Sequence, residues 1–173
     1  MTRSGGPLVV SVRDSRERIA FEEIYETHYR AVYRFALTTS GSSADAEEIT
    51  AEAFERAWRS WGGSPELVLP WLLTTARRIS TDRWRRARRW AQLVLRLRSR
   101  SYADAGEEQT EFWLWFHAVS KILTTRQRAV LALRYQHDLT DADIGEIMNL
   151  SASGVRSLAG RALAALRNHP ELL

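Results

Sequence analysis

The last third of the chain, residues 123–167, carries start signals for three short helices in close succession. Each signal is a hydroxyl that can accept a hydrogen bond from a free N–H group in the first helical turn. The three signals are Thr124 with Gln127, Thr140 with Asp143, and Ser151. Asn149 suits the left-handed backbone that ends a helix, so the pattern predicts a helix, a tight turn and a second helix. Many helical hairpins share this pattern, and by itself it leaves DNA binding open.

The final helix of this pattern is a candidate for reading base edges in a DNA groove. Its apolar residues repeat at helical spacing and predict a face that points inward; they are Val155, Leu158, Ala162 and Leu166. The outward residues nearer its N-terminus are expected at bases, and the last one at a phosphate. These outward residues are Ser153, Arg156, Ser157 and Arg161. For Leu158, its spacing favours packing over contact with a thymine methyl group.

Positive charge is concentrated in one segment rather than spread over the chain. The formal net charge is only +4, and 24 of the 25 cationic residues are arginine. A GC-rich genome explains most of that bias toward arginine. It does not explain residues 77–100, where ten arginines face one acid, a net charge of +9. Such a segment is typical of a surface that binds a polyanion.

Composition excludes several classes of function. The 173 residues contain no cysteine, which rules out disulfides, thiol catalysis and cysteine zinc sites. The four histidines lack metal-ligand spacing, and no phosphate-binding loop or nucleophile motif is present. We therefore expect no catalytic residue, no metal site and no cofactor. Apolar runs are shorter than a membrane span and the N-terminus lacks a signal-peptide core, so the expected location is cytoplasmic.

The periodicity of apolar residues predicts an all-α protein of two small helical domains joined by a flexible linker. Residues 1–16 are expected to form a flexible tail, 17–90 the first domain, 91–111 the linker and 112–173 the second domain. The expected helices of the first domain span about 19–39, 44–61 and 70–89, with Ser43 capping the second. Their predicted inward faces include Tyr25, Trp58 and Trp84.

The second expected helix carries a row of acids opposite its aromatic face. The four acids are Asp45, Glu48, Glu52 and Glu55. Their spacing places them on one side of the helix, where they could dock on a basic partner. The alternative is a solvated face with Glu52–Arg56 and Glu55–Arg59 pairs, and from spacing alone this alternative is favoured.

The third expected helix interleaves arginines with tryptophans, a composition suited to holding single-stranded nucleic acid. The candidate contacts are Arg77, Arg78, Arg85 and Arg86, with Trp71 as the residue on which a base could stack. Core packing is the simpler explanation for Trp84.

Three blocks in this order resemble one family, the bacterial RNA polymerase sigma factors. The blocks are DAEEITAEAFERAW (45–58), PWLLTTARRISTDRWRRARR (70–89) and the helix-turn-helix segment 123–167. The chain looks most like the small extracytoplasmic-function (ECF) group, which keeps only regions 2 and 4. Read this way, the first domain is the region 2 bundle and the second is the region 4 helix-turn-helix.

The resemblance implies a role for each surface. The acidic residues Asp45, Glu48, Glu52 and Glu55 would bind the β′ clamp of core RNA polymerase. Trp71, Arg77, Arg78, Arg85 and Arg86 would recognise and melt the −10 promoter element. Ser153, Arg156, Ser157 and Arg161 would read the −35 element. The polymerase β flap and an anti-sigma protein are further partners that the family implies.

Two alternatives remain open at the level of sequence. One is a helix-turn-helix regulator that binds DNA without replacing a sigma factor, and the other is a helical interaction protein with no nucleic-acid role. The first would need neither the acidic row nor the arginine-rich helix, and the second leaves the +9 segment unexplained.

Overall fold

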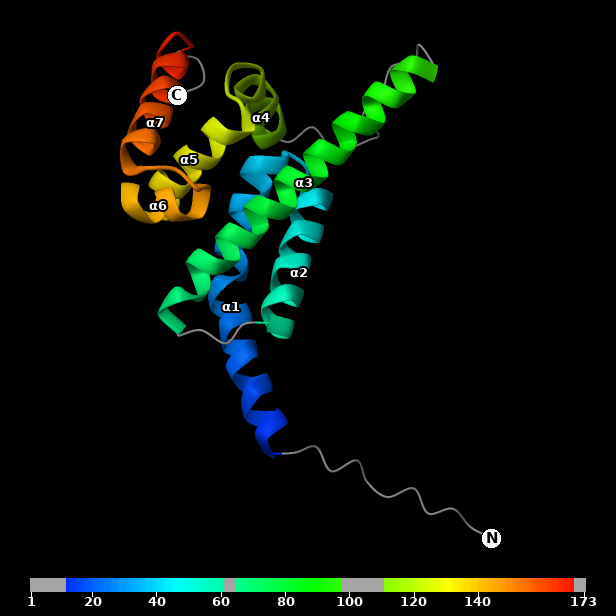
Figure 1. Ribbon diagram of the computed structural model, residues 1–173, viewed down its shortest axis with the longest axis vertical. Helices are drawn as coiled ribbons and strands as arrows, with labels where there is room; N and C mark the ends of the chain where they lie inside the picture. The colour runs from blue at the N-terminus through cyan, green and yellow to red at the C-terminus, as the bar shows by residue number, and fades with distance from the viewer. Residues whose placement is uncertain (1–11, 61–64, 98–110, 170–173) are drawn as a thin grey trace.

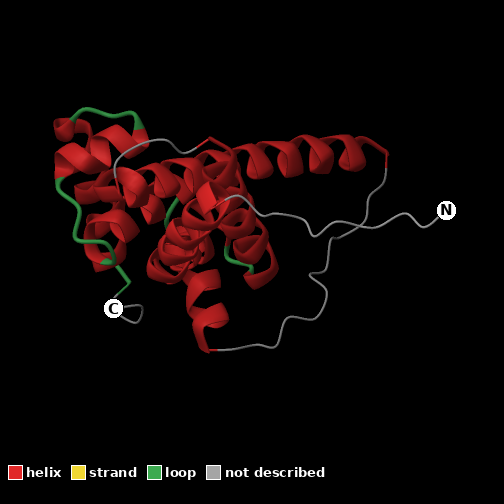
Figure 2. Cartoon of the chain, turned by 90° about the horizontal axis from the view of Figure 1, so that it is seen from below, coloured by secondary structure: helices red, strands yellow, loops and turns green. Residues whose placement is uncertain are grey.

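The computed structural model describes residues 12–60, 65–97 and 111–169, and throughout these ranges the fold is all-α, as predicted (Figures 1 and 2). The elements in chain order are α1 (Val12–Ser40), α2 (Ser43–Ser60), the 3-10 turn η1 (Pro65–Leu67), α3 (Val68–Leu97), α4 (Glu111–Ile122), α5 (Thr125–Tyr135), α6 (Asp141–Met148) and α7 (Ala152–Arg167). Helix α1 begins inside the predicted tail 1–16, and α3 continues into the predicted linker 91–111. Glu111, the last residue of that linker, begins α4, and residues 1–11 and 98–110 lie outside the described residues.

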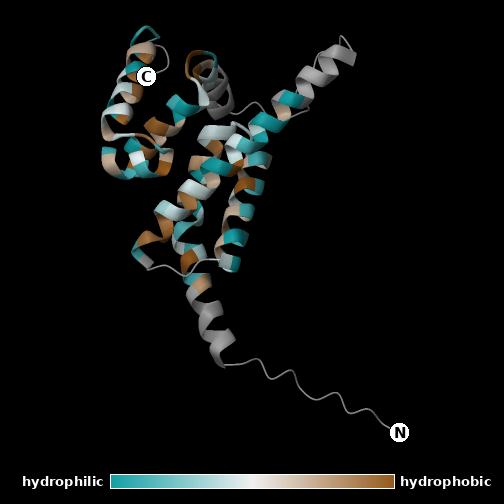
Figure 3. Ribbon diagram, in the orientation of Figure 1, coloured by the Kyte–Doolittle hydropathy of each residue, from teal (hydrophilic) through white to brown (hydrophobic). Residues whose placement is uncertain are grey.

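Helices α1, α2 and α3 form the first bundle. Gly41, with a φ of 79°, ends α1 by donating its N–H to the carbonyl of Leu37 at 2.8 Å. The cap of α2 is Ser42 rather than the predicted Ser43, because the Ser42 Oγ accepts the N–H of Asp45 at 3.2 Å. Small and branched side chains fill the space between the three helices, and polar residues occupy the outer faces (Figure 3). Fully buried members include Phe35, Ile49 and Leu72.

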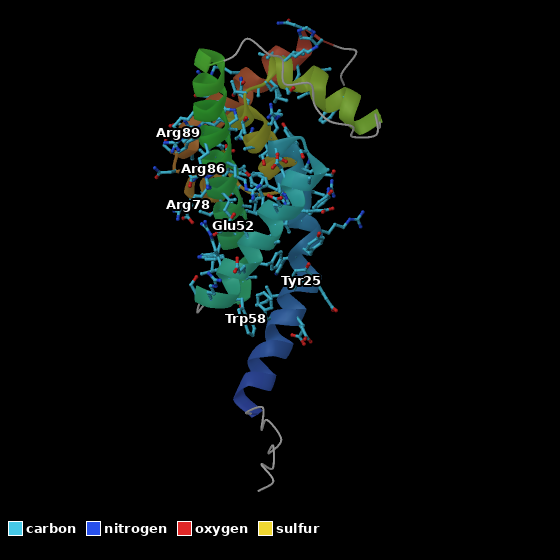
Figure 4. The ribbon with its side chains drawn as sticks, turned by 90° about the vertical axis from the view of Figure 1, so that its right-hand side faces the viewer. Tyr25, Glu52, Trp58, Arg78, Arg86 and Arg89 are labelled. Atoms are coloured by element: carbon cyan, nitrogen blue, oxygen red, sulfur yellow. The ribbon has the colours of Figure 1, made fainter. Side chains whose placement is uncertain are left out.

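Two aromatic residues that were expected to point inward are exposed. Tyr25 and Trp58 lie close together between α1 and α2, near the lower end of the bundle (Figure 4). They pack on one side only: the Tyr25 ring is 4.8 Å from that of Phe54, and the Trp58 ring is 4.9 Å from that of Phe21. The sequence pattern missed this because apolar spacing indicates which side of a helix faces its neighbours, but not how completely those neighbours cover it.

Helices α5, α6 and α7 form the second bundle, and its turn chemistry matches the prediction. Both capping boxes are present, at Thr124 and Thr140, and Asn149 adopts the left-handed conformation with a φ of 53°. The chain passes from α6 into α7 so tightly that a Cβ on Gly145 would lie 2.6 Å from the Leu150 carbonyl oxygen. A glycine is therefore required where α6 faces the turn.

The two bundles pack against each other through α5 on α1 and α6 on α3 (Figure 1). One continuous apolar cluster runs from Val32 and Phe35 of α1 to Leu133 of α5 and Ile144 of α6. Because of this shared core, the second bundle lies directly on the first within the described structure.

Arg128 of α5 anchors this contact, and only 8% of the residue is exposed. Its Nε donates to the Thr38 carbonyl at 3.2 Å, and its Nη2 donates to the Thr39 carbonyl at 3.3 Å. Its Nη1 donates to the Leu123 carbonyl at 2.8 Å. Thr38 and Thr39 lie in the last turn of α1, whose free carbonyls carry partial negative charge. Burial lowers the pKa of Arg128 from its ordinary value.

His137 lies on the same contact surface, in the loop between α5 and α6. Its ring meets that of Phe35 edge-on at 6.3 Å, and among the described residues its buried Nε2 finds no hydrogen-bond partner. Burial, and then the positive charge of Arg34, lower the pKa of His137 from its ordinary value.

Candidate nucleic-acid interface

The first two acids of the α2 row reach α3, the last two pair within α2, and so each of the four carboxylates has an ion-pair partner. Glu48 Oε2 lies 2.6 Å from Arg83 Nη1, and Asp45 Oδ1 lies 3.3 Å from the same nitrogen. Farther along the helix, the Oε1–Nη2 distance is 2.6 Å in both the Glu52–Arg56 pair and the Glu55–Arg59 pair. The sequence predicted the last two pairs from their spacing. It missed Arg83, because that contact joins residues 35 and 38 positions apart in the chain, on two different helices.

A basic stripe runs along the outer side of α3. The predicted residues Arg78, Arg85 and Arg86 are exposed there, and Arg78, Arg86 and Arg89 project from the same side of the helix (Figure 4). Asp82 reduces the positive charge of the stripe, because its carboxylate lies 3.9 Å from Arg85 Nη1. Its backbone carbonyl accepts a hydrogen bond from Arg86 Nε at 3.4 Å. Arg89 was missed, although its spacing from Arg78 and Arg85 places it on this face.

Arg77 does not lie on the exposed stripe as predicted. It is half-buried, and its Nε donates a 2.8 Å hydrogen bond to the Ile147 carbonyl of α6. Burial, followed by repulsion from neighbouring arginines such as Arg78, lowers the pKa of Arg77 from its ordinary value. No sequence signal marks this contact, because Ile147 is 70 residues away.

Of the two tryptophans, Trp84 lies in a different environment from the one expected, and Trp71 is only partly exposed. Trp71, predicted as a base-stacking residue, is half-buried and packs against the core of the first bundle. Trp84, predicted to be in the core, is 52% exposed. Ser80 still packs on α1 through a 3.4 Å contact with Thr39, and Arg83 reaches α2, so burial at this end of α3 falls off residue by residue and the ring of Trp84 remains half exposed.

The predicted reading face of α7 is exposed as a set: Ser153, Arg156, Ser157 and Arg161 all face outward. Arg156 Nη1 lies 3.5 Å from Asp141 Oδ2, and Asp141 also pairs with Arg134, so a carboxylate of α6 orients the first arginine. Arg161 Nε donates to the Ser157 carbonyl at 3.3 Å. Leu158 packs against the core, as its spacing favoured.

These surfaces together suit binding rather than catalysis. Within the described ranges, no cluster of three or more His, Asp or Glu side chains is arranged to hold a metal ion. Across the same part of the chain, none of the helices is both long enough and apolar enough to span a membrane. The arrangement consists of an acidic helix face, an adjoining basic stripe and a second bundle with its own exposed arginines.

Comparison with protein families matches both bundles. The model for sigma-70 region 2 matches residues 24–90, and the model for sigma-70 region 4 matches residues 121–168. These two ranges contain the acidic row, the basic stripe and the helix-turn-helix.

Relatives align over most of the chain. It is 30% identical over 168 residues to the ECF RNA polymerase sigma factor SigK of Mycobacterium ulcerans, covering 88% of this chain and 86% of the relative. It is 27% identical over 156 residues to the RNA polymerase sigma-E factor of Streptomyces avermitilis, covering 90% and 87%. It is 26% identical over 166 residues to the ECF sigma factor SigX of Bacillus subtilis, covering 88% and 84%.

The fold also has a solved counterpart. The sigma factor RpoE of Bartonella quintana, solved in complex with the anti-sigma factor NepR, superposes with a TM-score of 0.68 at 20% identity. The match covers 88% of this chain and 96% of that one, and it supports the arrangement of helices.

Proposed function

The chain belongs to the sigma-70 family, in its ECF group, and from this we propose how its surfaces divide the steps of transcription initiation. As a sigma factor it directs RNA polymerase to promoters. It is a transcription initiation factor and not a classical enzyme, so the phosphodiester chemistry belongs to the polymerase.

The acidic row of α2 is proposed to bind core polymerase at the β′ clamp. Support comes from the position of the row within the region 2 match and from its accessibility: Asp45, Glu48 and Glu55 are exposed, and the Glu52 side chain is 31% exposed. Its ion pairs are exposed and therefore weak in water, so a basic partner surface can replace the arginines. Asp45, Glu48, Glu52 and Glu55 are the proposed contacts.

The basic stripe of α3 is proposed to hold the single strand at the −10 element. Arg78, Arg85 and Arg86 are exposed and contiguous, and Arg89 extends the same face. Arg77 belongs to this set once its bond to α6 is released. Trp71 adjoins the segment before α3 and is proposed to stack on an unpaired base, a contact that forms only after the strands separate.

Helix α7 is proposed to read the −35 element. Ser153, Arg156 and Ser157 lie in its N-terminal half, the part of a recognition helix that contacts base edges. Arg161 lies about one turn further on and is proposed to contact a phosphate. The domain at 112–173 is also proposed to contact the polymerase β flap.

An anti-sigma protein is a further proposed partner, since the solved counterpart is a sigma factor in complex with an anti-sigma factor. Association with core polymerase would place this protein in the cytoplasm.

The observation that carries the proposal is the pairing of an acidic helix face with a basic stripe on adjoining helices of the region 2 match. The test is a titration of core polymerase with the Glu52→Lys variant, followed by transcription from a promoter library. Glu47→Lys is the matched control: its carboxylate lies on the same helix but near Tyr29 of α1, whose pKa is raised by burial and by nearby Tyr25 and Glu47.

Wild-type protein and Glu47→Lys should assemble with polymerase and yield a defined transcript, and Glu52→Lys should assemble more weakly. Equal affinity of all three would contradict the assignment of the acidic row. Specific DNA binding with no affinity for polymerase would instead favour a regulator that acts alone.

A further inference from the structure

Arg83 connects the two charged surfaces of the first bundle. It is an α3 residue, but its Nη1 lies 2.6 Å from Glu48 and 3.3 Å from Asp45, both on α2. The Arg83 side chain is 31% exposed, whereas those of Glu48 and Asp45 are 63% and 54% exposed. The contact is therefore open to water and to any partner that approaches α2.

Arg83 also borders the basic stripe. Arg86 follows it by three residues, so the two side chains are neighbours on the helix surface. Arg86 points outward beside Arg78 and Arg89 (Figure 4). A small change in the Arg83 side chain, with no movement of the backbone, would carry its guanidinium from the acids of α2 toward a phosphate held along the stripe.

A basic partner on α2 and Arg83 compete for the same two carboxylates. An exposed ion pair is weak, and a partner that presents its own cations to Glu48 and Asp45 displaces Arg83 from them. A guanidinium that has lost its carboxylates next to a nucleic-acid backbone gains from bidentate phosphate contact.

We propose that Arg83 is a cation shared between the two surfaces: Glu48 and Asp45 hold it in the free protein, and docking of a basic partner on α2 releases it to the nucleic acid bound along α3. This inference rests on the proposed function of the two surfaces. It makes partner binding and nucleic-acid binding mutually reinforcing, with the same coupling in both directions.

The first experiment uses the isolated chain and a fluorescent single-stranded oligo(dT) at low salt. Glu48→Gln should raise its affinity severalfold more than Glu47→Gln does, although both remove one negative charge from α2. The dependence on salt should also steepen, by about 0.7 in the log–log slope for one added phosphate contact. In an Arg83→Gln background, Glu48→Gln and Glu47→Gln should have equal effects.

The second experiment compares the free chain with the chain bound to core polymerase. Arg86→Gln should weaken binding of DNA in both forms. In the polymerase complex, Arg83→Gln should weaken DNA binding about as much as Arg86→Gln does, measured on a promoter fork with an exposed single strand. In the free chain, Arg83→Gln should have little effect on DNA binding. Arg83→Lys, which keeps the charge, should restore much of the affinity. A thermal melt of each variant checks that the bundle remains folded.

Two results would overturn the proposal. One is an equal gain from Glu48→Gln and Glu47→Gln in the wild-type background, and the other is an equal effect of Arg83→Gln in the free and bound forms. Either would show that docking on α2 does not transfer Arg83 from the acids to the nucleic acid. Failure to bind core polymerase would refute the proposed function separately, because the oligo(dT) measurement decides the position of Arg83 without polymerase.

Discussion

Arg128 donates a hydrogen bond to the carbonyl of Thr39, 89 residues earlier in the chain, and in doing so closes the end of α1 with a residue of α5. The same guanidinium also donates hydrogen bonds to the carbonyls of Thr38 and Leu123. A buried cation is costly unless its donors are used, and here three backbone acceptors compensate for its desolvation. The contact therefore fixes how the second bundle sits on the first.

Replacing Arg128 by Met should destabilise the protein substantially. The variant keeps an apolar stem but leaves the last carbonyls of α1 without these donors, and hydrogen bonds to charged groups contribute about 1.5–3 kcal/mol. We expect the free energy of unfolding in urea to fall by about 2–3 kcal/mol. Arg126→Met, an exposed neighbour on α5, should change it by no more than about 0.5 kcal/mol. Equal losses in the two variants would contradict the anchoring role of Arg128.

Trp71 should act in promoter opening beyond its part in packing. Trp71→Leu preserves an apolar contact and should cost less than about 1.5 kcal/mol of stability. It removes the aromatic face, and stacking of one base is worth about 1–3 kcal/mol. Permanganate reactivity of −10 thymines should therefore fall in Trp71→Leu and recover in Trp71→Phe, at equal promoter occupancy. Normal reactivity in the leucine variant would leave Trp71 a packing residue only.

Two glycines of the second bundle should respond oppositely to alanine. A Cβ on Gly145 would press on the Leu150 carbonyl oxygen, and Gly145→Ala should destabilise by about 1–3 kcal/mol. A Cβ on Gly160 meets nothing within 4 Å, so Gly160→Ala should stabilise by up to about 1 kcal/mol through helix propensity. Denaturant titration of both variants checks the sign, and a loss of stability in Gly160→Ala would contradict its open surroundings.

Arg156 and Arg161 should differ in what they contribute to −35 binding. Arg156→Ala should flatten the preference among −35 variants, because an arginine on guanine discriminates by about 1–3 kcal/mol. Arg161→Ala should weaken binding to every sequence alike and reduce its salt dependence. Affinities for a panel of −35 substitutions at two salt concentrations separate the two effects. An unchanged ranking in Arg156→Ala would place the reading face elsewhere.

Stability should fall on mild acidification because of His137. Its folded pKa lies below the ordinary value of 6.5, so the unfolded chain binds a proton that the folded chain resists. The free energy of unfolding should be highest above pH 6.5, the ordinary histidine pKa. It should decrease as the pH falls from 6.5 toward the lower pKa of His137 in the folded protein. His137→Gln should reduce this slope. His28, whose pKa burial also lowers, should account for part of the remainder. An unchanged slope in the variant would contradict the role of His137.

Local chemistry predicted the parts of this fold that depend on neighbours in sequence. The capping hydroxyl of Thr140 and the left-handed Asn149 are set by residues within one turn, so spacing alone located the helix-turn-helix. The acidic row was found for the same reason. Trp84 was misassigned because helical periodicity says which side of α3 points inward and not where the neighbouring helices stop.

Contacts between distant segments could not be predicted in this way. The packing of whole helices determines two such contacts, Arg83 with Glu48 and Arg128 with Thr39. The sequence around an arginine in a basic run does not indicate which distant residue it will contact. The individual DNA and polymerase contacts stay predictions, since a pattern indicates which residues face outward but not what reaches them.

The bond from Arg77 to the Ile147 carbonyl joins the helix proposed to bind nucleic acid to α6 of the second bundle. A nucleic acid that takes the Nε–H of Arg77 must break that bond, so part of its binding free energy is spent on separating α6 from α3. By thermodynamic linkage, we expect a partner that loosens α6 from α3 to raise the affinity of this surface for nucleic acid, and bound nucleic acid to raise the affinity for that partner by the same factor.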